Sequence, residues 1–158
     1  MIPFRRTLSF VFASLLFVSA TGMAQLAKAE MPDDVSLELL GRDLVYSFSY
    51  QHLFSPKFGL EAGVSLLGGS GSSVFFLNGG GRFYFSSRNS SPCISAGVVF
   101  ASASYGGPLD SDAATSYGYV GPGFEYRSSS GFLFRGTVYF IFRTGFFVWP
   151  GIQAGIAF

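Results

Sequence analysis

The sequence predicts an all-β fold, an eight-stranded antiparallel transmembrane β-barrel that follows an N-terminal signal peptide. Three observations favour it. Apolar and small or polar residues alternate with a period of two through most of the chain. Turn-forming residues separate the alternating runs. Charged residues make up only 12% of the 158 residues, about half the share of a typical soluble domain, whereas aromatic residues make up 18%.

The same composition excludes several classes of protein. A disordered chain would need high charge and few aromatic residues. A nucleic-acid-binding protein would need a basic surface, but the formal net charge is only +1. A disulfide-stapled domain would need more than the single cysteine that the chain carries. The length suits one domain, and the 21 glycines argue against a helical one.

The first segment to explain is the N-terminus, which has the three zones of a secretory signal peptide. Arg5 and Arg6 provide the positive start, and an apolar run covers 8–20. Small residues follow, with candidate cleavage positions after Ala24 and after Ala29. The run is shorter than the roughly 20 residues that a membrane-spanning helix needs, so an uncleaved anchor is the weaker alternative.

We therefore divide the chain into a signal peptide at 1–29 and a barrel domain at 30–158. Removing residues 1–29 takes away three of the ten basic residues and none of the nine acidic ones, so the exported chain carries about two net negative charges. No electrostatic attraction to nucleic acid remains.

Seven strands follow from the alternation, most of them about as long as a tilted strand that crosses a bilayer. In the first of them, Leu44, Tyr46 and Phe48 share one face and Val45 and Ser47 the other. The predicted strands are 44–54, 58–67, 74–85, 93–104, 116–127, 131–142 and 150–158. Turn signals place periplasmic connections at 55–57, 86–92 and 128–131, and outer connections at 68–73, 105–115 and 143–149.

Parity requires one more strand, because a barrel with both chain ends on the same side has an even number. The run 35–40 supplies it, with a tight turn at 41–43. Val35, Leu37 and Leu39 would then face lipid, and Glu38 would point inward.

The position of the charges decides which face meets lipid. Glu61, Arg82, Glu125 and Arg135 lie within the strands, and all four fall on the small, polar face. A soluble barrel would turn charges to water and aromatic residues inward, whereas a membrane barrel does the reverse. Together with Glu38, these residues predict an ion-pair network in the lumen, in which Glu125 and Arg135 lie nearly opposite across one hairpin.

A resemblance adds to this interpretation. The signal peptide, the alternating strands and the terminal run Gly151–Phe158 resemble the small eight-stranded outer-membrane β-barrel proteins of Gram-negative bacteria. The stretches around 39–47 and 134–151 are similar to one functionally uncharacterised branch of that group. The resemblance implies a location in the outer membrane, contact with outer-membrane lipids and lipopolysaccharide, and assembly by the outer-membrane insertion machinery, for which Phe158 would be the signal.

Aromatic residues gather near both ends of the predicted strands, which is typical of belts at the two membrane interfaces, although plain β-propensity also enriches aromatic residues in strands. The inner belt would comprise Phe54, Phe58, Phe85, Tyr126, Phe132 and Phe158. The outer belt would comprise Phe75, Tyr105, Tyr117, Phe142, Phe146, Phe147 and Trp149.

Catalytic and metal sites have little support in the sequence. His52 is the only histidine, and its parity points to lipid near an inner strand end, where an interfacial role suits it better than catalysis. One histidine and one cysteine cannot provide a usual metal site, and we expect no cofactor. We expect Cys93 to be a small packing residue, with an intermolecular disulfide as the alternative.

The expected function is therefore a structural, adhesive or surface-interaction role for a monomeric barrel with a plugged lumen. Loop 105–115, with Asp110 and Asp112, would be the contact surface. A narrow pore for small solutes is the first alternative. A lipid-modifying enzyme that uses His52 is the second.

Overall fold

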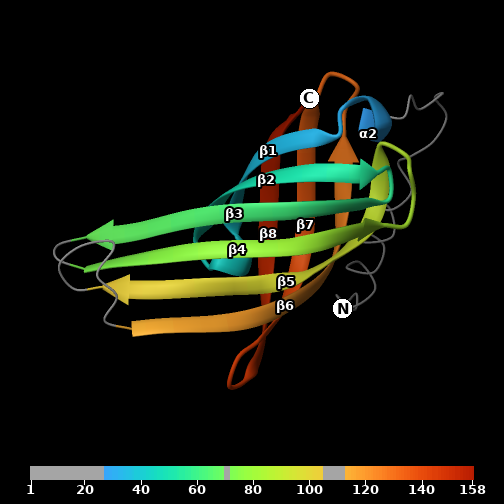
Figure 1. Cartoon of the computed structure of the whole chain (residues 1–158). Helices are drawn as coiled ribbons and strands as arrows, with labels where there is room; N and C mark the ends of the chain where they lie inside the picture. Colours follow the sequence, from blue (N-terminus) through green and yellow to red (C-terminus); the bar gives the residue numbers. More distant parts are fainter. Residues whose placement is uncertain (1–26, 70–71, 105–112) are drawn as a thin grey trace, which may run out of the picture.

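The computed structural model describes residues 27–69, 72–104 and 113–158, and it forms one closed antiparallel barrel (Figure 1). Each strand pairs with its neighbours in the sequence, and β1 pairs with β8 to close the sheet. The strands are β1 Asp33–Leu40, β2 Tyr46–Ser55, β3 Phe58–Gly69, β4 Ser72–Tyr84, β5 Ser90–Ser104, β6 Ala113–Arg127, β7 Phe132–Phe142 and β8 Phe146–Ala157. Two short helices, α2 Ala27–Glu30 and the 3₁₀ turn η1 Gly41–Asp43, flank β1.

The eighth strand that parity demanded is present. β1 lies between β2 and β8, with Asp34 opposite Ala157 and Leu40 opposite Gly151. At the end of the chain, the backbone N–H of Phe158 donates to the carbonyl oxygen of Asp33 at 2.9 Å. We call this end of the barrel the near rim, and the end that holds η1 and the β7–β8 turn the far rim.

Exposed and buried residues alternate along the strands as the sequence predicts. In β3 the alternation is unbroken from Phe58 to Ser65, with Glu61 and Ser65 inside and Leu60 and Val64 outside. The exterior carries large apolar side chains on every strand, such as Phe48, which is 59% exposed. The barrel is therefore apolar outside and charged inside, the reverse of a soluble β-barrel.

The start of β2 departs from this alternation. The alternation predicts Leu44 on the apolar face and Val45 on the opposite one, and this prediction is wrong. Val45 is exposed, whereas Leu44 packs against buried aromatic residues of the lumen. Leu44 has a φ of 73°, so the chain reverses its facing there before β2 begins at Tyr46.

The last outer connection is also shorter than predicted. The turn signals predict a loop at 143–149, but β8 already begins at Phe146, which pairs with Phe142. The β-propensity of the Phe-Phe-Val run drives this extension. Pro150 is tolerated because β1 pairs with β8 only as far as Gly151, so the proline lies where β8 has a free side.

The barrel wall has unequal height. Strands β3 to β6 have 12 to 15 residues, and they extend past the other strands at the far rim (Figure 1). The pairing of β6 with β5 continues to Ala113, whereas its pairing with β7 stops at Gly118. Within the described residues no helix is long and apolar enough to cross a membrane. The predicted signal sequence up to residue 26, Tyr105, Asp110 and Asp112 lie outside the described residues.

Candidate functional site in the barrel lumen

The lumen is the candidate site, because it contains ten buried charged side chains at a ratio of one cation to one anion. All ten are at most 5% exposed. The five cations are Lys28, Arg42, Arg82, Arg127 and Arg135, and the five anions are Asp34, Glu38, Asp43, Glu61 and Glu125. Burying a charge without a partner is costly, so a balanced set is the arrangement that such a lumen requires.

The structure places all five predicted lumen residues inside and brings them together in two groups. Glu125 and Arg135 are direct partners in the β6–β7 register, with Arg135 Nε 2.5 Å from Glu125 Oε2. Glu61 and Arg82 form a second pair, with Arg82 Nη2 2.8 Å from Glu61 Oε2. Glu38 belongs to the second group, and its cation comes from the turn that follows β1.

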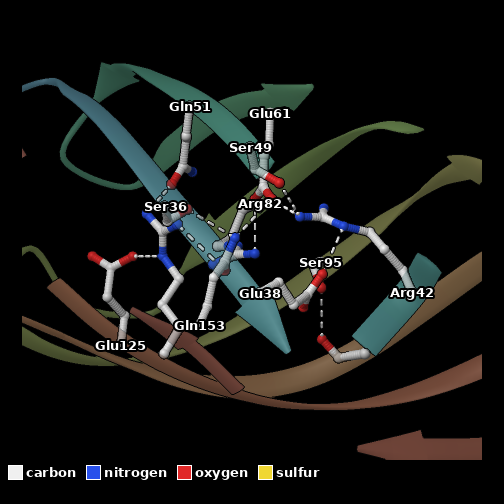
Figure 2. A network of polar contacts seen from close by, with 12 residues as sticks. Ser36, Glu38, Arg42, Ser49, Gln51, Glu61, Arg82, Ser95, Glu125 and Gln153 are labelled. Atoms are coloured by element: carbon white, nitrogen blue, oxygen red, sulfur yellow. Dashed lines mark hydrogen bonds and ion pairs between the residues drawn. The ribbon is translucent and has the colours of Figure 1, made fainter. Parts of the chain in front are cut away.

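That residue is Arg42 of η1. The guanidinium turns into the lumen, where its Nε lies 3.1 Å from Glu38 Oε2 and its Nη2 pairs with Glu61 (Figure 2). Glu61 therefore lies between Arg42 and Arg82. We call Glu38, Arg42, Glu61 and Arg82 the central cluster. The tight turn predicted at 41–43 is confirmed as η1, and its three residues are buried.

A second group, the near-rim cluster, comprises Asp34, Glu125, Arg127 and Arg135. Arg127 and Arg135 converge on the same carboxylate oxygen, Asp34 Oδ2, each at 2.5 Å. Arg127 Nε also lies 3.5 Å from Glu125 Oε1. The two anions and two cations alternate around a compact ring, so each charge has neighbours of the opposite sign. The four side chains come from β1, β6 and β7, so the cluster links strands on both sides of the β1–β8 closure.

Two glutamines join the clusters. Gln153 donates from Nε2 to Glu61 at 3.2 Å and to Ser36 at 3.0 Å (Figure 2). Arg135 donates to Gln51, which also accepts from the hydroxyl of Tyr84 at 3.2 Å. The hydroxyl of Tyr84 donates to Glu125 as well. Arg135 Nη1 also donates to Gln153 Oε1 at 3.4 Å, so the central and near-rim clusters are parts of one polar network that runs along the lumen.

Toward the far rim the lumen filling changes from charged to aromatic. The aromatic cluster comprises Phe76, Val99, Tyr117, Tyr119, Tyr139 and Ile141. Its hydroxyls connect it to the charges: Tyr139 donates to Glu38 at 2.7 Å, and Tyr117 donates to the carbonyl oxygen of Arg42 at 2.6 Å. Glycine makes the room, since a Cβ at Gly80 would lie 2.4 Å from the hydroxyl oxygen of Tyr119.

The assignment of two residues to the outer aromatic belt is therefore wrong. Tyr117 is a buried member of the aromatic cluster, and Trp149 packs against that cluster opposite Tyr139. Both lie on the inward face of their strands. The β-propensity of aromatic residues, which was the alternative explanation, accounts for these two. The other described belt residues of the far rim, such as Phe75 and Phe142, are exposed.

Besides Arg42 and Asp43 of the turn, the predicted network lacks Asp34, Arg127 and Lys28. Asp34 shares the inward parity of Ser36 and Glu38, and Arg127 shares that of Glu125, so alternation carried the signal. They were overlooked because they lie at strand ends, where boundaries are least certain. Lys28 had no such signal, because it precedes the first strand and was assigned to the signal peptide.

On the exterior, His52 lies near the near rim, as expected from its parity. Its Nδ1 is 2.8 Å from Asp33 Oδ1, and the hydroxyl of Tyr50 donates to the same oxygen. The side chain of His52 is 41% exposed, so this is a surface pair. Cys93 is buried between Leu53 and Tyr84, which suits a packing residue.

Comparisons with known proteins support the architecture. No family model and no curated protein sequence matches the chain. Among solved structures, the N-terminal β-barrel domain of Pseudomonas aeruginosa OprF is similar, with a TM-score of 0.58, 12% identity, and coverage of 80% of this chain and 95% of that one. A de novo designed protein, TMB2.3, gives a TM-score of 0.46 at 17% identity over 81% of this chain and 93% of the design. Ail, the attachment invasion locus protein of Yersinia pestis, gives 0.42 at 12% identity over 80% and 98%.

The predicted fold class is thereby confirmed: the chain has the eight-stranded antiparallel architecture of outer-membrane β-barrels. The narrower likeness of 39–47 and 134–151 to one branch of that group stays a prediction.

Proposed function

We propose that this protein is an integral outer-membrane β-barrel with a plugged lumen and a surface-interaction role at its far rim. The observation that carries the proposal is the inverted distribution of side chains: charges inside, large apolar residues outside. Monomeric soluble proteins rarely expose a contiguous apolar surface of more than a few hundred Å². Here the apolar exterior is present on every strand, as a lipid-facing surface requires.

Backbone pairing supports membrane insertion. Lipid offers no hydrogen-bond partners, so only closed sheets and helices span a bilayer. The β1–β8 pairing closes this sheet over seven successive residue pairs. A tilted strand needs about 9 to 11 residues to cross the hydrocarbon core, and seven of the eight strands have ten or more.

The plugged lumen is supported by how the interior is filled. Eight strands leave an interior just wide enough for side chains. Here the polar network and the aromatic cluster take up that width in succession along the barrel axis. We expect purified protein in planar bilayers to show no stepwise conductance. Reproducible stepwise currents from the wild-type protein would support the narrow-pore alternative.

The surface-interaction role is supported by the taller wall at the far rim. In β6 the residues Ala113–Tyr117 pair with β5 only, and in β3 the residues beyond Val64 pair with β4 only. Strand edges without a partner in the sheet are templates for pairing with another chain. Asp110 and Asp112, in the connection between β5 and β6, remain the proposed contact residues.

The proposed partners are outer-membrane lipids and lipopolysaccharide around the barrel, and the insertion machinery during assembly. Phe158 supports the second, because its side chain is 58% exposed at the near rim while its backbone pairs with Asp33. We propose that the barrel acts as a monomer without cofactor or enzymatic activity.

The decisive test is cell fractionation combined with gel mobility before and after boiling. We expect the protein in the outer-membrane fraction, with a mobility shift on boiling that marks a folded barrel. Phe158→Ala should lower the folded, membrane-inserted fraction, whereas Phe85→Ala, another exposed aromatic residue at this rim, should leave it unchanged. Recovery of the wild-type protein in the periplasm without detergent would overturn the proposal.

A further inference from the structure

The segment that precedes β1 is fixed to the near rim. The backbone N–H of Leu53 donates to the carbonyl oxygen of Pro32 at 2.8 Å, which extends the β1–β2 ladder beyond Asp33. Arg127 Nη1 donates to the carbonyl oxygen of Met31 at 2.5 Å. Arg127 is a member of the near-rim cluster, so the segment is held by the same cation that pairs with Asp34. The polar network therefore does not end at the first strand.

One turn earlier, Lys28 of α2 enters the lumen. Its side chain is fully buried, and its ammonium nitrogen lies 3.7 Å from Glu125 Oε1. The same nitrogen lies 3.7 Å from the centroid of the Tyr84 ring, a cation–π distance. Tyr84 in turn donates to Glu125. Lys28, Tyr84 and Glu125 thus form a closed triangle of contacts at the mouth of the barrel.

Charge balance shows what Lys28 contributes. With Lys28 the described lumen holds five cations and five anions, and without it four cations face five anions. An uncompensated charge in a dry lumen is strongly unfavourable. Burial lowers the pKa of Lys28 to about 8, partly opposed by the attraction of Glu125, so the ammonium form still prevails at neutral pH.

The two candidate cleavage positions differ in whether they keep this residue. Cleavage after Ala29 removes Lys28, whereas cleavage after Ala24 retains it. We propose that the exported protein retains Lys28 as the cation that closes the near rim of the lumen, and that the signal peptide is therefore cut after Ala24. This assignment concerns the processing and closure of the barrel and does not depend on the role of the far rim.

The first experiment is the intact mass of the protein isolated from membranes after expression with its own signal sequence. We expect a chain that begins at Gln25, with allowance for cyclisation of an N-terminal glutamine. A chain that begins at Glu30 would overturn the proposal. Location in the membrane is read separately by fractionation, so failure of this proposal and failure of the proposed function are distinguishable.

The second experiment uses the lysines as matched probes. From residue 25 onward the chain has only two lysines, Lys28 and the exposed Lys57. We expect an amine-reactive label at pH 7.5 to modify Lys57 at least tenfold faster than Lys28 in the folded barrel, and both alike in denaturant. Equal labelling in the folded barrel would contradict burial of Lys28 in the lumen.

A pair of variants tests whether the contact stabilises the barrel. In chains that begin at Gln25, Lys28→Gln should lower the temperature at which the folded gel band disappears by about 5 °C. Lys57→Gln should leave that temperature unchanged. Identical temperatures for the two variants would show that Lys28 does not act as a closing cation.

Discussion

The two ends of the lumen are filled by opposite chemistry. At the near rim, Asp34, Glu125, Arg127 and Arg135 form alternating ion pairs with distances down to 2.5 Å. Toward the far rim, the aromatic cluster fills the same width mostly with rings, and Asp43 of η1 is the buried carboxylate beside it. The near rim is therefore filled mainly by paired charges, and the far rim mainly by packed side-chain volume.

The difference teaches how each end should fail. A buried ion pair contributes little net stability compared with a well-packed apolar pair, yet removal of one partner leaves the other charge uncompensated. A packed aromatic cluster loses stability in proportion to the volume removed. Changes at the near rim should therefore act in an all-or-none way, and changes at the far rim in a graded way.

The largest effect should come from Arg135→Ala. This change leaves both Asp34 and Glu125 with one guanidinium fewer, and it also removes a donor to Gln51. We expect the free energy of unfolding to fall by about 3 to 5 kcal/mol. Urea unfolding in lipid vesicles, followed by tryptophan fluorescence, measures it. The exposed Arg88→Ala is the control, and a similar loss in both variants would contradict the role of the cluster.

The next effect should come from Ile141→Ala in the aromatic cluster. Ile141 is 1% exposed, so its truncation leaves a cavity in the lumen. We expect a loss of about 3 kcal/mol, with Ile141→Val losing about 1 kcal/mol. Ile152→Ala, on the exterior, should lose less because lipid fills the vacated space. A loss of the same size for the valine and alanine variants would contradict graded packing.

The smallest effect should come from the exterior pair. His52→Ala removes the contact with Asp33, but both side chains are partly exposed. A surface pair contributes at most about 1 kcal/mol, so stability should hardly change. The lipid A profile of cells should also be unaltered, as we propose no catalytic role for His52. A changed profile would revive the enzyme alternative.

Most of the fold could be predicted from the sequence, because residues that alternate with a period of two lie on opposite faces of a strand. It placed Glu125 and Arg135 opposite each other, since a short hairpin fixes the register of adjacent strands. The strand β1 was also predicted, because a barrel with both chain ends on the same side has an even number of strands. The extended β8 was missed because Pro150 reads as a strand breaker, and only its position beyond the β1 ladder makes it harmless.

The site was predicted in part, for a different physical reason. Within a strand, parity decides whether a side chain points inward, so Glu38, Glu61 and Arg82 were found. In a turn no parity applies, so nothing indicated that Arg42 folds back against Glu61. Tyr117 and Trp149 were misassigned because aromatic residues suit a membrane interface and a packed lumen equally well.

By itself, then, the sequence determined the sidedness of this protein: apolar residues outside, charges inside, and a sheet that must close. These properties follow from local alternation, which is independent of any distant residue. Only the tertiary structure decided which charges meet, that a turn and a segment before the first strand supply three of the ten, and that the far half of the lumen is mostly aromatic. Those outcomes depend on barrel closure, which brings together residues as far apart as Asp34 and Arg135.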